Sequence, residues 1–388
     1  MSTPLPPLQG IRVLDLSRLL PGPFCSLILA DLGAEVLKVE DTRGGDYLRM
    51  IPPLTSGGAS GAFAALNRGK RSLSIDLKQA RGRELFLELV ARYDVVLESF
   101  RPGVLARLGL DFETLRRANP RLVLCSISGY GQGGPLEQRA GHDINYLALA
   151  GVLAAGGDAD GAPALPGVQI ADIAGGALWA AVRILAELSR GEGRQAVHLD
   201  VSMTEGVLAF LVPWFGDLGA GGAPLRRGKN TLNGGAACYG VYPTGDDGYM
   251  SVGSLEPKFW AALNGALGRK ADMSDPVAPL ERQREIRAEL ESKLSAHGRD
   301  AWAETLAPAD ACVEPVLEME EVSAHPQHVA RDAFFEHEGV KLPRLPLGAT
   351  RALSPAPTQG QHTDEVLRSE LALDETTLAE LRSGGVIR

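Results

Sequence analysis

Short runs of β-branched residues alternate with helical stretches through the first half of the chain, and this rhythm constrains the fold more than any other feature. The expected strands lie at 11–17, 35–39, 72–77, 94–99 and 122–127, and the expected helices at 24–33 and 81–93, with another after Leu105. Parallel strands covered by helices are the simplest packing for this pattern. The sequence therefore predicts an α/β fold with a parallel sheet.

The pattern of expected strands and helices changes in the second half of the chain. A helix at 177–189, a strand at 195–201 and a helix at 204–214 continue the first lobe, and residues 219–235, rich in glycine and basic residues, are typical of a linker. A β-hairpin at 239–243 and 249–252, helices within 257–307, a proline-rich strand-and-loop region at 334–357 and two short helices at 361–384 follow. We expect a large domain at 1–190, a linker at 191–225, a small α+β domain at 226–320, and a return linker with a C-terminal segment packing on the large domain at 321–388.

The composition excludes several classes of protein. At 388 residues the chain exceeds what one hydrophobic core usually serves, so two domains are the default expectation. The net charge of −9 argues against a nucleic-acid partner. The four cysteines are widely spaced, which gives no metal-ligand pattern and indicates free thiols. We find no secretion signal and no membrane span, so we expect a cytoplasmic protein without metal, redox cofactor or membrane contact.

The hexapeptide Gly141–Tyr146 places an imidazole, a carboxylate, an amide and a phenol behind a flexible glycine loop. A histidine exchanges protons near neutral pH without help from a metal, and its neighbours can fix which ring nitrogen does so. The cluster predicts proton transfer at His142, although a purely structural histidine also fits so local a motif.

Two carboxylates stand near expected helix starts. Asp172 precedes Gly175, Gly176 and a long helix, so an N-cap is its simplest role. A carboxylate beside amides that glycines leave bare also suits proton transfer or nucleophilic attack, and the two roles are compatible. Glu256 precedes Pro257 at another helix start. If domains or subunits close, Glu256 would meet His142 and orient it, as a second carboxylate does for catalytic histidines.

Glycines at 129–134 follow a strand and formally match the dinucleotide fingerprint. That fingerprint needs a helix directly behind it, whereas residues 135–141 are short, polar and closed by another glycine. We therefore expect these glycines to keep side chains away from a loop that approaches a ligand, rather than to bind a nicotinamide nucleotide.

Basic residues gather at 67–71 and 101–107, both near strand ends of the first lobe. In an α/β layout, strand ends are where phosphates bind. A solvated basic loop accounts for part of these side chains. In an acidic protein, local cations indicate a phosphorylated small molecule rather than a polymer.

Taken together, several motifs resemble the family III CoA-transferases. They are the segments 10–17, 21–24, 30–36 with 39–40, 70–72 with 76–78, and 141–146. Within that superfamily the chain is similar to the α-methylacyl-CoA racemase branch, and the similarity continues through 233–236, 256–257 and 310–313 to near residue 365.

This resemblance implies a CoA-thioester enzyme of lipid metabolism with a large Rossmann-like lobe and a smaller lobe joined by long linkers. Two chains would interlock like rings into a homodimer, with the active site at the subunit interface. The residues that would hold CoA by resemblance are Arg43, Ile75, Asp76, Leu77, Lys78, Arg107, Gly141 and Tyr146. Racemases tend to place a basic residue just after the second strand, where this chain has Asp41-Thr42 and Arg43 only two positions later.

In the racemase branch, His142 and Asp172 would face opposite sides of the substrate α-carbon, with Glu256 supporting His142. One base removes the α-proton and the other returns it, because a single base would tend to give retention. The enolate oxygen also needs donors, for which backbone amides of the glycine loops and of the helix at Asp172 are candidates.

The rival function is a true CoA-transferase, in which Asp172 attacks the acyl-CoA and forms a mixed anhydride and then an aspartyl-CoA thioester. Two features favour the racemase: transferases of the family usually lack a histidine at His142, and they carry a glycine-rich loop where this chain has residues 251–256. An inactive CoA-binding protein is disfavoured, because His142, Asp172 and Glu256 are all present.

Overall fold

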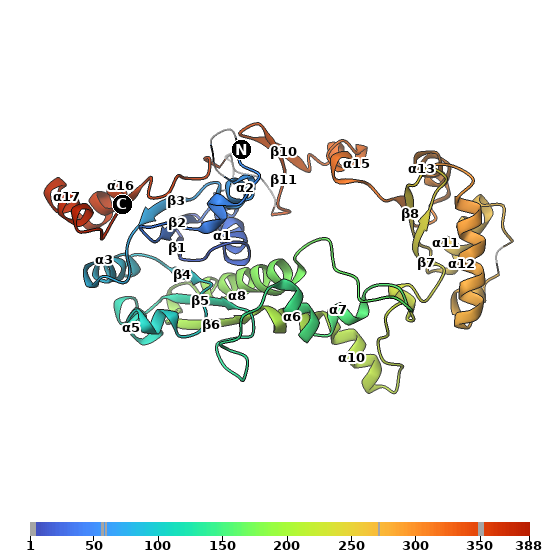
Figure 1. Ribbon diagram of the computed structural model, residues 1–388, viewed down its shortest axis with the longest axis horizontal. Coiled ribbons are helices and arrows are strands. Elements are labelled where there is room, and N and C mark those ends of the chain that lie inside the picture. Colours follow the sequence, from blue (N-terminus) through green and yellow to red (C-terminus); the bar gives the residue numbers. More distant parts are fainter. Residues whose placement is uncertain (1–4, 56–57, 59, 271, 348–352) are drawn as a thin grey trace. The chain divides into compact units, whose positions relative to one another are not determined.

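A computed structural model of the chain describes residues 5–55, 58, 60–270, 272–347 and 353–388. The chain forms two compact units (Figure 1). Unit 1 contains Met1–Ala150, Val168–Phe210 and Phe334–Arg388, and unit 2 contains Gly151–Gly167 and Leu211–Ala333. Part of the range 191–225, which we expected to be a linker, thus belongs to unit 1.

A six-stranded sheet forms the centre of unit 1, and every neighbouring pair of its strands is parallel. Its order is β3 (Arg71–Ser74), β2 (Glu35–Glu40), β1 (Arg12–Asp15), β4 (Val95–Glu98), β5 (Val123–Ser128) and β6 (Val197–Ser202). Strands β1 to β5 are almost entirely buried, as expected for a sheet covered on both faces, whereas β6 at one edge is partly exposed. The predicted α/β fold with a parallel sheet is confirmed, and its strand order is that of a doubly wound Rossmann sheet.

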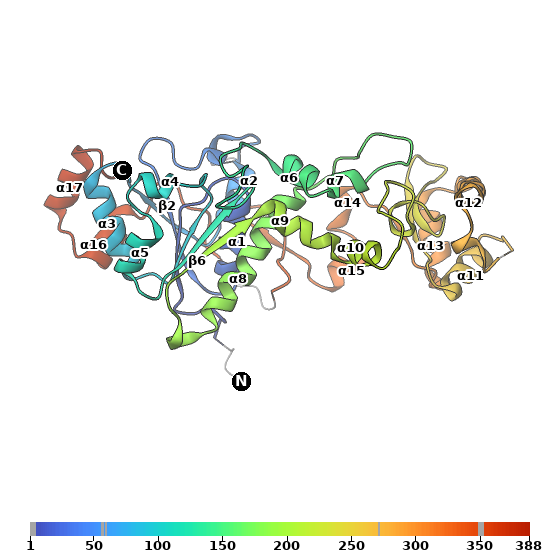
Figure 2. The ribbon, with the colours of Figure 1, turned by 90° about the horizontal axis from the view of Figure 1, so that it is seen from below.

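Helices cover both faces of this sheet. On one side lie α3, α5 and α16, and on the other α1 and α8 (Figure 2). The helices of unit 1 are α1 (Pro21–Asp31), α2 (Gly61–Asn67), α3 (Ala80–Val90), α4 (Val104–Arg107), α5 (Phe112–Ala118), α6 (Asp143–Leu149), α8 (Trp179–Leu188), α9 (Met203–Leu208), α16 (Thr363–Leu371) and α17 (Glu375–Ser383). The hairpin β10 (Phe334–His337) and β11 (Val340–Pro343) completes the unit. The two short helices expected at 361–384 are confirmed.

The third strand ends earlier than the sequence predicts. We expected a strand over 72–77, but β3 stops at Ser74. Ile75 forms a bridge with Ile387, and the amide of Asp76 donates to the Val386 carbonyl at 2.8 Å. The C-terminal segment therefore helps to hold residues 75–78 as a loop at the carboxyl edge of the sheet.

Asp172 is not an N-cap, and this expectation was wrong. A π-helix spans Ala171–Leu178 and continues directly into α8, with Ile170 at the cap position and Asp172 in the first turn. Glycines permit close packing on this helix, because a Cβ at Gly206 of α9 would lie 2.6 Å from the Gly175 carbonyl carbon. Helix α9 thus packs backbone to backbone against the π-helix. Wide π turns are rare and are frequent at functional sites.

Unit 2 is built on a three-stranded antiparallel sheet of β7 (Tyr239–Pro243), β8 (Tyr249–Gly253) and β9 (Val313–Pro315), so the predicted β-hairpin is confirmed. Its core includes Tyr242, Trp260 and Ile286. The helices are α7 (Val152–Ala155), α10 (Val212–Gly219), α11 (Pro257–Ala266), α12 (Leu280–Leu294), α13 (Arg299–Leu306), α14 (Met319–Val322) and α15 (Pro326–Ala330).

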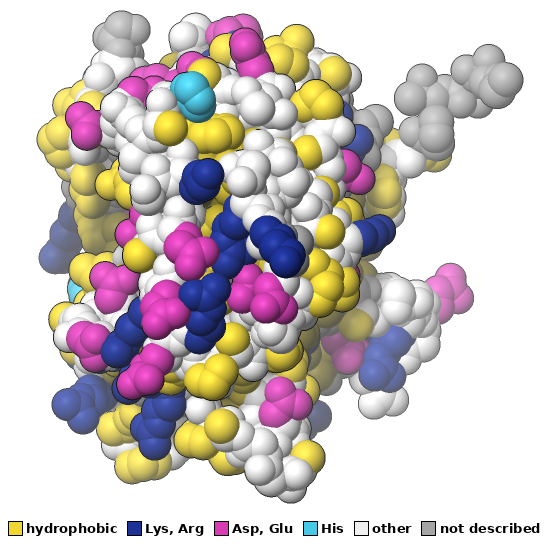
Figure 3. Space-filling view, turned by 90° about the vertical axis from the view of Figure 1, so that its right-hand side faces the viewer, with side chains coloured by type: hydrophobic (Ala, Val, Ile, Leu, Met, Phe, Trp, Pro, Cys, Tyr) yellow, Lys and Arg dark blue, Asp and Glu magenta, His cyan; other side chains and the backbone are white. Residues whose placement is uncertain are grey.

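The surface of unit 2 around α12 carries charges of both signs, and Figure 3 shows basic and acidic side chains next to one another there. Arg282, for example, lies 2.8 Å from Glu285 and 3.2 Å from Glu289. Within the described residues, no helix combines the length and the apolar character that crossing a membrane requires.

Candidate active site

A pocket of about 440 Å³, here called the strand-end pocket, opens at the carboxyl edge of the sheet in unit 1. The segments after β1, β2, β3 and β4 line it, and the strand order reverses between β1 and β4. Such a switch point is where open α/β sheets bind ligands. The lining residues are Leu16, Arg18, Val39, Glu40, Asp41, Thr42, Arg43, Gly44, Ile75, Asp76, Leu77, Lys78, Phe100, Val104 and Leu108.

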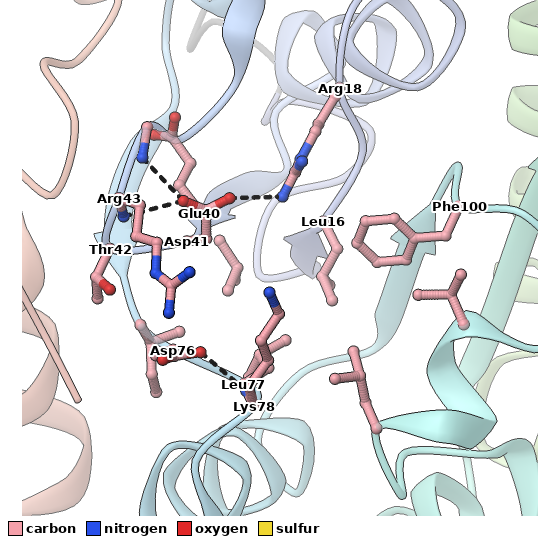
Figure 4. Close-up of a pocket in the computed structure, with 15 residues that line it drawn as sticks. Leu16, Arg18, Glu40, Asp41, Thr42, Arg43, Asp76, Leu77, Lys78 and Phe100 are labelled. Atoms are coloured by element: carbon pink, nitrogen blue, oxygen red, sulfur yellow. Dashed lines mark hydrogen bonds and ion pairs between the residues drawn. The ribbon is translucent and has the colours of Figure 1, made fainter. Parts of the chain in front are cut away.

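The five expected CoA residues that come first in the sequence, Arg43 and the run Ile75–Lys78, all line the strand-end pocket. Figure 4 shows Arg43 and Lys78 extending into it from two neighbouring loops. The amide of Lys78 donates to the Asp76 carboxylate at 3.0 Å, which shapes the second loop. Arg107 lies on α4 between two lining residues but is not itself part of the lining.

A second pocket of about 570 Å³, here called the histidine pocket, contains the other expected site residues of unit 1 except Arg107. The predicted site residues that line it are Gly141, His142, Tyr146 and Asp172. Its other lining residues are Arg18, Leu19, Pro21, Tyr47, Ser99, Phe100, Arg101, Pro102, Ile127, Ser128, Gly129, Tyr130, Glu137, Arg139, Ala140, Asn145 and Met203. Arg18 and Phe100 line both pockets, so the two pockets adjoin.

Local hydrogen bonds position the two candidate bases. His142 is exposed at the N-cap of α6, and its amide donates to the Asn145 side-chain oxygen at 3.0 Å. Asp172 is half-buried, and its amide donates to the Asp143 carboxylate at 3.0 Å. Asp143, directly after His142, therefore ties the histidine loop to the π-helix.

Glycines let the tyrosine rings of the histidine pocket approach the backbone closely. The Tyr146 hydroxyl donates to the Gly141 carbonyl at 2.6 Å. A Cβ at Gly141 would lie 2.7 Å from ring atom Cε1 of Tyr146, and one at Gly129 would lie 2.7 Å from Cζ. No helix opens directly behind the 129–134 glycines, since α6 begins only at Asp143. This arrangement fits a ligand-approaching loop rather than a dinucleotide fingerprint.

The electrostatics of the histidine pocket suit proton transfer. Burial raises the pKa of Asp172 to about 6, the Asp143 carboxylate adds to this rise, and His142 opposes it. Burial and the nearby Asp172 raise the pKa of Tyr146 to about 12, so this phenol keeps its proton. Near neutral pH, Asp172 is thus a carboxylate with an unusually high affinity for a proton, which is what a general base needs.

The raised pKa of Asp172 makes a prediction about stability. The folded protein disfavours the ionised carboxylate, so the cost is absent below the ordinary pKa of 3.8, grows between 3.8 and 6, and is complete above 6. We expect Asp172→Asn to raise the free energy of unfolding at pH 8 by about 1–2 kcal/mol, and the gain to vanish near pH 4. Denaturant titrations at both pH values measure this.

A matched control for that experiment is Asp111→Asn. Asp111 caps α5 and accepts the Thr114 amide, a hydrogen bond that lowers the pKa of its carboxyl group. Removing its charge should bring no gain at pH 8. If Asp172→Asn stabilised the protein equally at both pH values, the charge of Asp172 would not be the cause.

Glu256 belongs to unit 2, whereas His142 and Asp172 belong to unit 1. It is the N-cap residue of α11, as the sequence predicts, and its side chain is exposed. Its charge contributes, after burial, to raising the pKa of the nearby Cys312 thiol. The contact between Glu256 and His142 stays a prediction.

Sequence reasoning missed Arg18 and Phe100, the two residues common to both pockets. They follow β1 and β4 closely, the strands on either side of the switch point. The rule that ligands bind beyond the carboxyl ends of such strands was the signal that could have found them. It also missed the role of Asp143, which lies inside the 141–146 motif.

Comparisons with known proteins identify the family of the chain. A family model described as CoA-transferase family III matches residues 8–363. The chain is 38% identical over 390 residues to an alpha-methylacyl-CoA racemase of Homo sapiens (98% of this chain, 97% of the relative). It is 31% identical over 396 residues to a succinyl-CoA:glutarate CoA-transferase of Homo sapiens (98% and 90%). A crystal structure of a CAIB/BAIF family protein from Brucella suis is similar, with a TM-score of 0.83 and 30% identity (94% and 99%).

The match of the family model extends over both units, and the relatives align over nearly their whole length. The chain therefore belongs to CoA-transferase family III, whose members among its relatives include racemases as well as CoA-transferases.

Proposed function

We propose that this protein is a racemase or epimerase of 2-methylacyl-CoA thioesters that acts by removing and returning the α-proton through an enolate. One observation carries the proposal: His142 and Asp172, two groups able to exchange protons, line one pocket, and the pKa of Asp172 is raised to about 6. The identity of 38% with the human racemase and 36% with that of Mus musculus supports it.

In the proposed mechanism His142 and Asp172 act on opposite faces of the α-carbon and hold one proton between them. Whichever is deprotonated takes the α-proton, and the other returns a proton to the opposite face, so the configuration inverts. Glu256 would orient the imidazole of His142. Two chains would pair as an interlocked homodimer. The Glu256 that supports His142 would then come from the same chain or from the partner chain.

The enolate formed in this reaction needs hydrogen-bond donors at the thioester oxygen. The amides of Asp172 and His142 already donate to Asp143 and Asn145. In the glycine loop at 129–134, the amides of Gly131 and Gln132 likewise donate, to Ser128 and Asp200. Both the glycine loops and the start of the π-helix therefore stay candidates for the donors.

CoA would occupy both pockets in this proposal. Its nucleotide would lie in the strand-end pocket among Arg43 and the loop Ile75–Lys78, with Arg107 nearby on α4. Its thioester would reach the histidine pocket, where Gly141 and Tyr146 flank His142. The adjoining pockets together suit a long ligand with an anionic end and an acyl end.

The alternative is a CoA-transferase in which Asp172 attacks the thioester carbonyl and forms an aspartyl-CoA intermediate. Relatives such as an acetyl-CoA:oxalate CoA-transferase of Acetobacter aceti, 34% identical over 354 residues, favour it. A half-buried carboxylate that lines a pocket suits a nucleophile as well as a base. His142, however, has no evident task in that reaction.

The test of the proposal is to incubate the protein with a single epimer of a 2-methylacyl-CoA and to analyse the acyl group by chiral chromatography. We expect a near-equal mixture of both epimers. Recovery of the starting epimer alone, under conditions in which CoA binds, would speak against a racemase.

A further inference from the structure

We propose that Arg18 binds the diphosphate of the CoA moiety, at the point where the strand-end pocket meets the histidine pocket, and that Asp41 positions it there. This inference rests on the proposed function, because it takes an acyl-CoA thioester as the ligand. It assigns a ligand group to a residue that neither the sequence motifs nor the expected CoA-binding set includes.

The location of Arg18 is the first argument. Its side chain lines both pockets, is 35% exposed, and pairs with Asp41 through Nη2 at 2.9 Å (Figure 4). The guanidinium carbon lies 5.8 Å from the centroid of the Phe100 ring, the other residue common to both pockets. Among the described residues, Nη2 is the nitrogen of this guanidinium that donates a hydrogen bond, which leaves Nε and Nη1 for a ligand.

The backbone around Arg18 is held in a costly conformation. Leu19, the next residue, has a φ of 63°, which a bulky side chain rarely adopts. Its amide donates to the Asp46 carboxylate at 3.2 Å, and the Arg18 amide donates to the Ser99 hydroxyl at 3.3 Å. Strain of this kind persists only where surrounding contacts impose it, and it concentrates at ligand sites.

A buried ion pair imposes this conformation. Lys38 Nζ lies 3.0 Å from Asp46, and both side chains are at most 1% exposed. Lys38 also donates to the Ser17 carbonyl at 2.9 Å, so the pair fixes the backbone on both sides of Arg18. Arg18 is therefore a cation presented by a rigid loop, which reduces the ordering cost when a ligand binds.

Asp41 acts as the positioning residue. One of its carboxylate oxygens accepts the amides of Arg43, Gly44 and Gly45 at 3.0, 2.9 and 3.3 Å, while the other holds Arg18. Burial alone would raise the pKa of Asp41, but these amides and Arg18 lower it overall, so the group stays an anion. An acidic residue just after the second strand thus recruits a cation from the neighbouring loop.

The order of charges along the pockets identifies the ligand group. Arg43 and Lys78 line only the strand-end pocket, and Arg101 and Arg139 line only the histidine pocket. Arg18 lines both pockets and stands at their junction. In CoA the 3′-phosphate belongs to the nucleotide end, and the diphosphate joins the nucleotide to the pantetheine arm. A guanidinium fork fits the oxygens of a phosphate in two-point contact. The cation at the junction therefore matches the diphosphate.

The experiment compares Arg18→Gln with the wild-type protein by calorimetric binding of CoA, 3′-dephospho-CoA and ADP, the last by competition against CoA. The three ligands share the diphosphate but differ in the 3′-phosphate and the pantetheine arm. We expect the variant to bind each ligand about 10–100-fold more weakly, by a similar factor for all three. The control is Arg81→Gln, which removes an exposed arginine that pairs with Glu84 on α3 and lines neither pocket, and it should leave all three affinities unchanged.

Three results would overturn the assignment of Arg18. A loss confined to CoA would place Arg18 at the 3′-phosphate, a loss confined to the two ligands with a pantetheine arm would place it on that arm, and unchanged affinities would remove it from the site. An unchanged thermal midpoint of Arg18→Gln confirms that the variant is folded. If the wild-type protein itself bound none of the ligands, the proposed function would fail as well, which is a distinct outcome.

Discussion

His142→Ala and Asp172→Asn should each lower kcat/KM for epimerisation of a 2-methylacyl-CoA by about 10²–10⁴-fold, the range that a positioned acid or base contributes. The reason is that inversion needs a group on each face of the α-carbon, and each variant removes one of them. Both residues line the histidine pocket, and Asp172 is set up as a base by burial and by Asp143. Initial rates measured by chiral analysis from each epimer provide the test.

The two variants also separate the two candidate reactions. In a racemase, a protein that lacks His142 should still exchange the α-proton of the one epimer whose proton faces Asp172. In a CoA-transferase, His142→Ala should leave CoA transfer largely intact, whereas Asp172→Asn should abolish it. Asp111→Asn on α5 serves as the control for loss of a carboxylate outside both pockets. Full epimerisation by either site variant would contradict the two-base account.

Gly206→Ala should destabilise the protein by about 3 kcal/mol, at the upper end of the usual cost of overpacking. A Cβ at this position would lie 2.6 Å from the carbonyl carbon and 2.7 Å from the Cα of Gly175. Both are backbone atoms of the π-helix that carries Asp172, so no side chain can move aside to make room. Helix α9 and the π-helix would have to separate. Urea titration of the purified variant measures the loss.

Gly216→Ala is the matched control for this substitution. Gly216 lies inside α10, and a Cβ there would meet no atom within 4 Å. Alanine is the better helix former, so this variant should gain about 0.5–1 kcal/mol. If Gly206→Ala unfolded at the same urea concentration as the wild type, the close packing of α9 on the π-helix would not be a feature of the protein.

The sequence predicts the sheet of unit 1 well because its strands are short, apolar and separated by helical periods. Where the prediction fails, the cause lies far away along the chain. The strand expected at 72–77 ends at Ser74, since Ile75 and Asp76 pair with residues 387 and 386. The residue pattern around 72–77 does not indicate a pairing with residues more than 300 positions away.

Asp172 shows a second limit of local reasoning. Gly175 and Gly176 indicated a helix start close by, but the π-helix already begins at Ala171, and its Gly175 packs against Gly206 on another helix. A contact of this kind depends on glycines from two helices, so the sequence of either helix alone does not predict it. The motifs nevertheless singled out His142 and Asp172, and both residues line one pocket of the structure.

Arg18 shows why the remaining part of the site escaped prediction. Its importance arises from the strand order, which brings the segment after β1 next to those after β2 and β4. A single arginine after a strand carries no motif of its own. The family pattern led us to expect a basic residue just after the second strand, but this chain has Asp41 there. Asp41 pairs with Arg18, which lies at the junction of the two pockets.

The most direct test of the proposed function is one NMR experiment in D₂O with the protein, a (2R)-2-methylacyl-CoA and a free carboxylic acid such as succinate. We expect deuterium to appear at the α-carbon together with loss of stereochemical purity, while CoA stays on its acyl group. Transfer of CoA to the free acid without exchange at the α-carbon would contradict the account, and it would make Asp172 a nucleophile rather than a base.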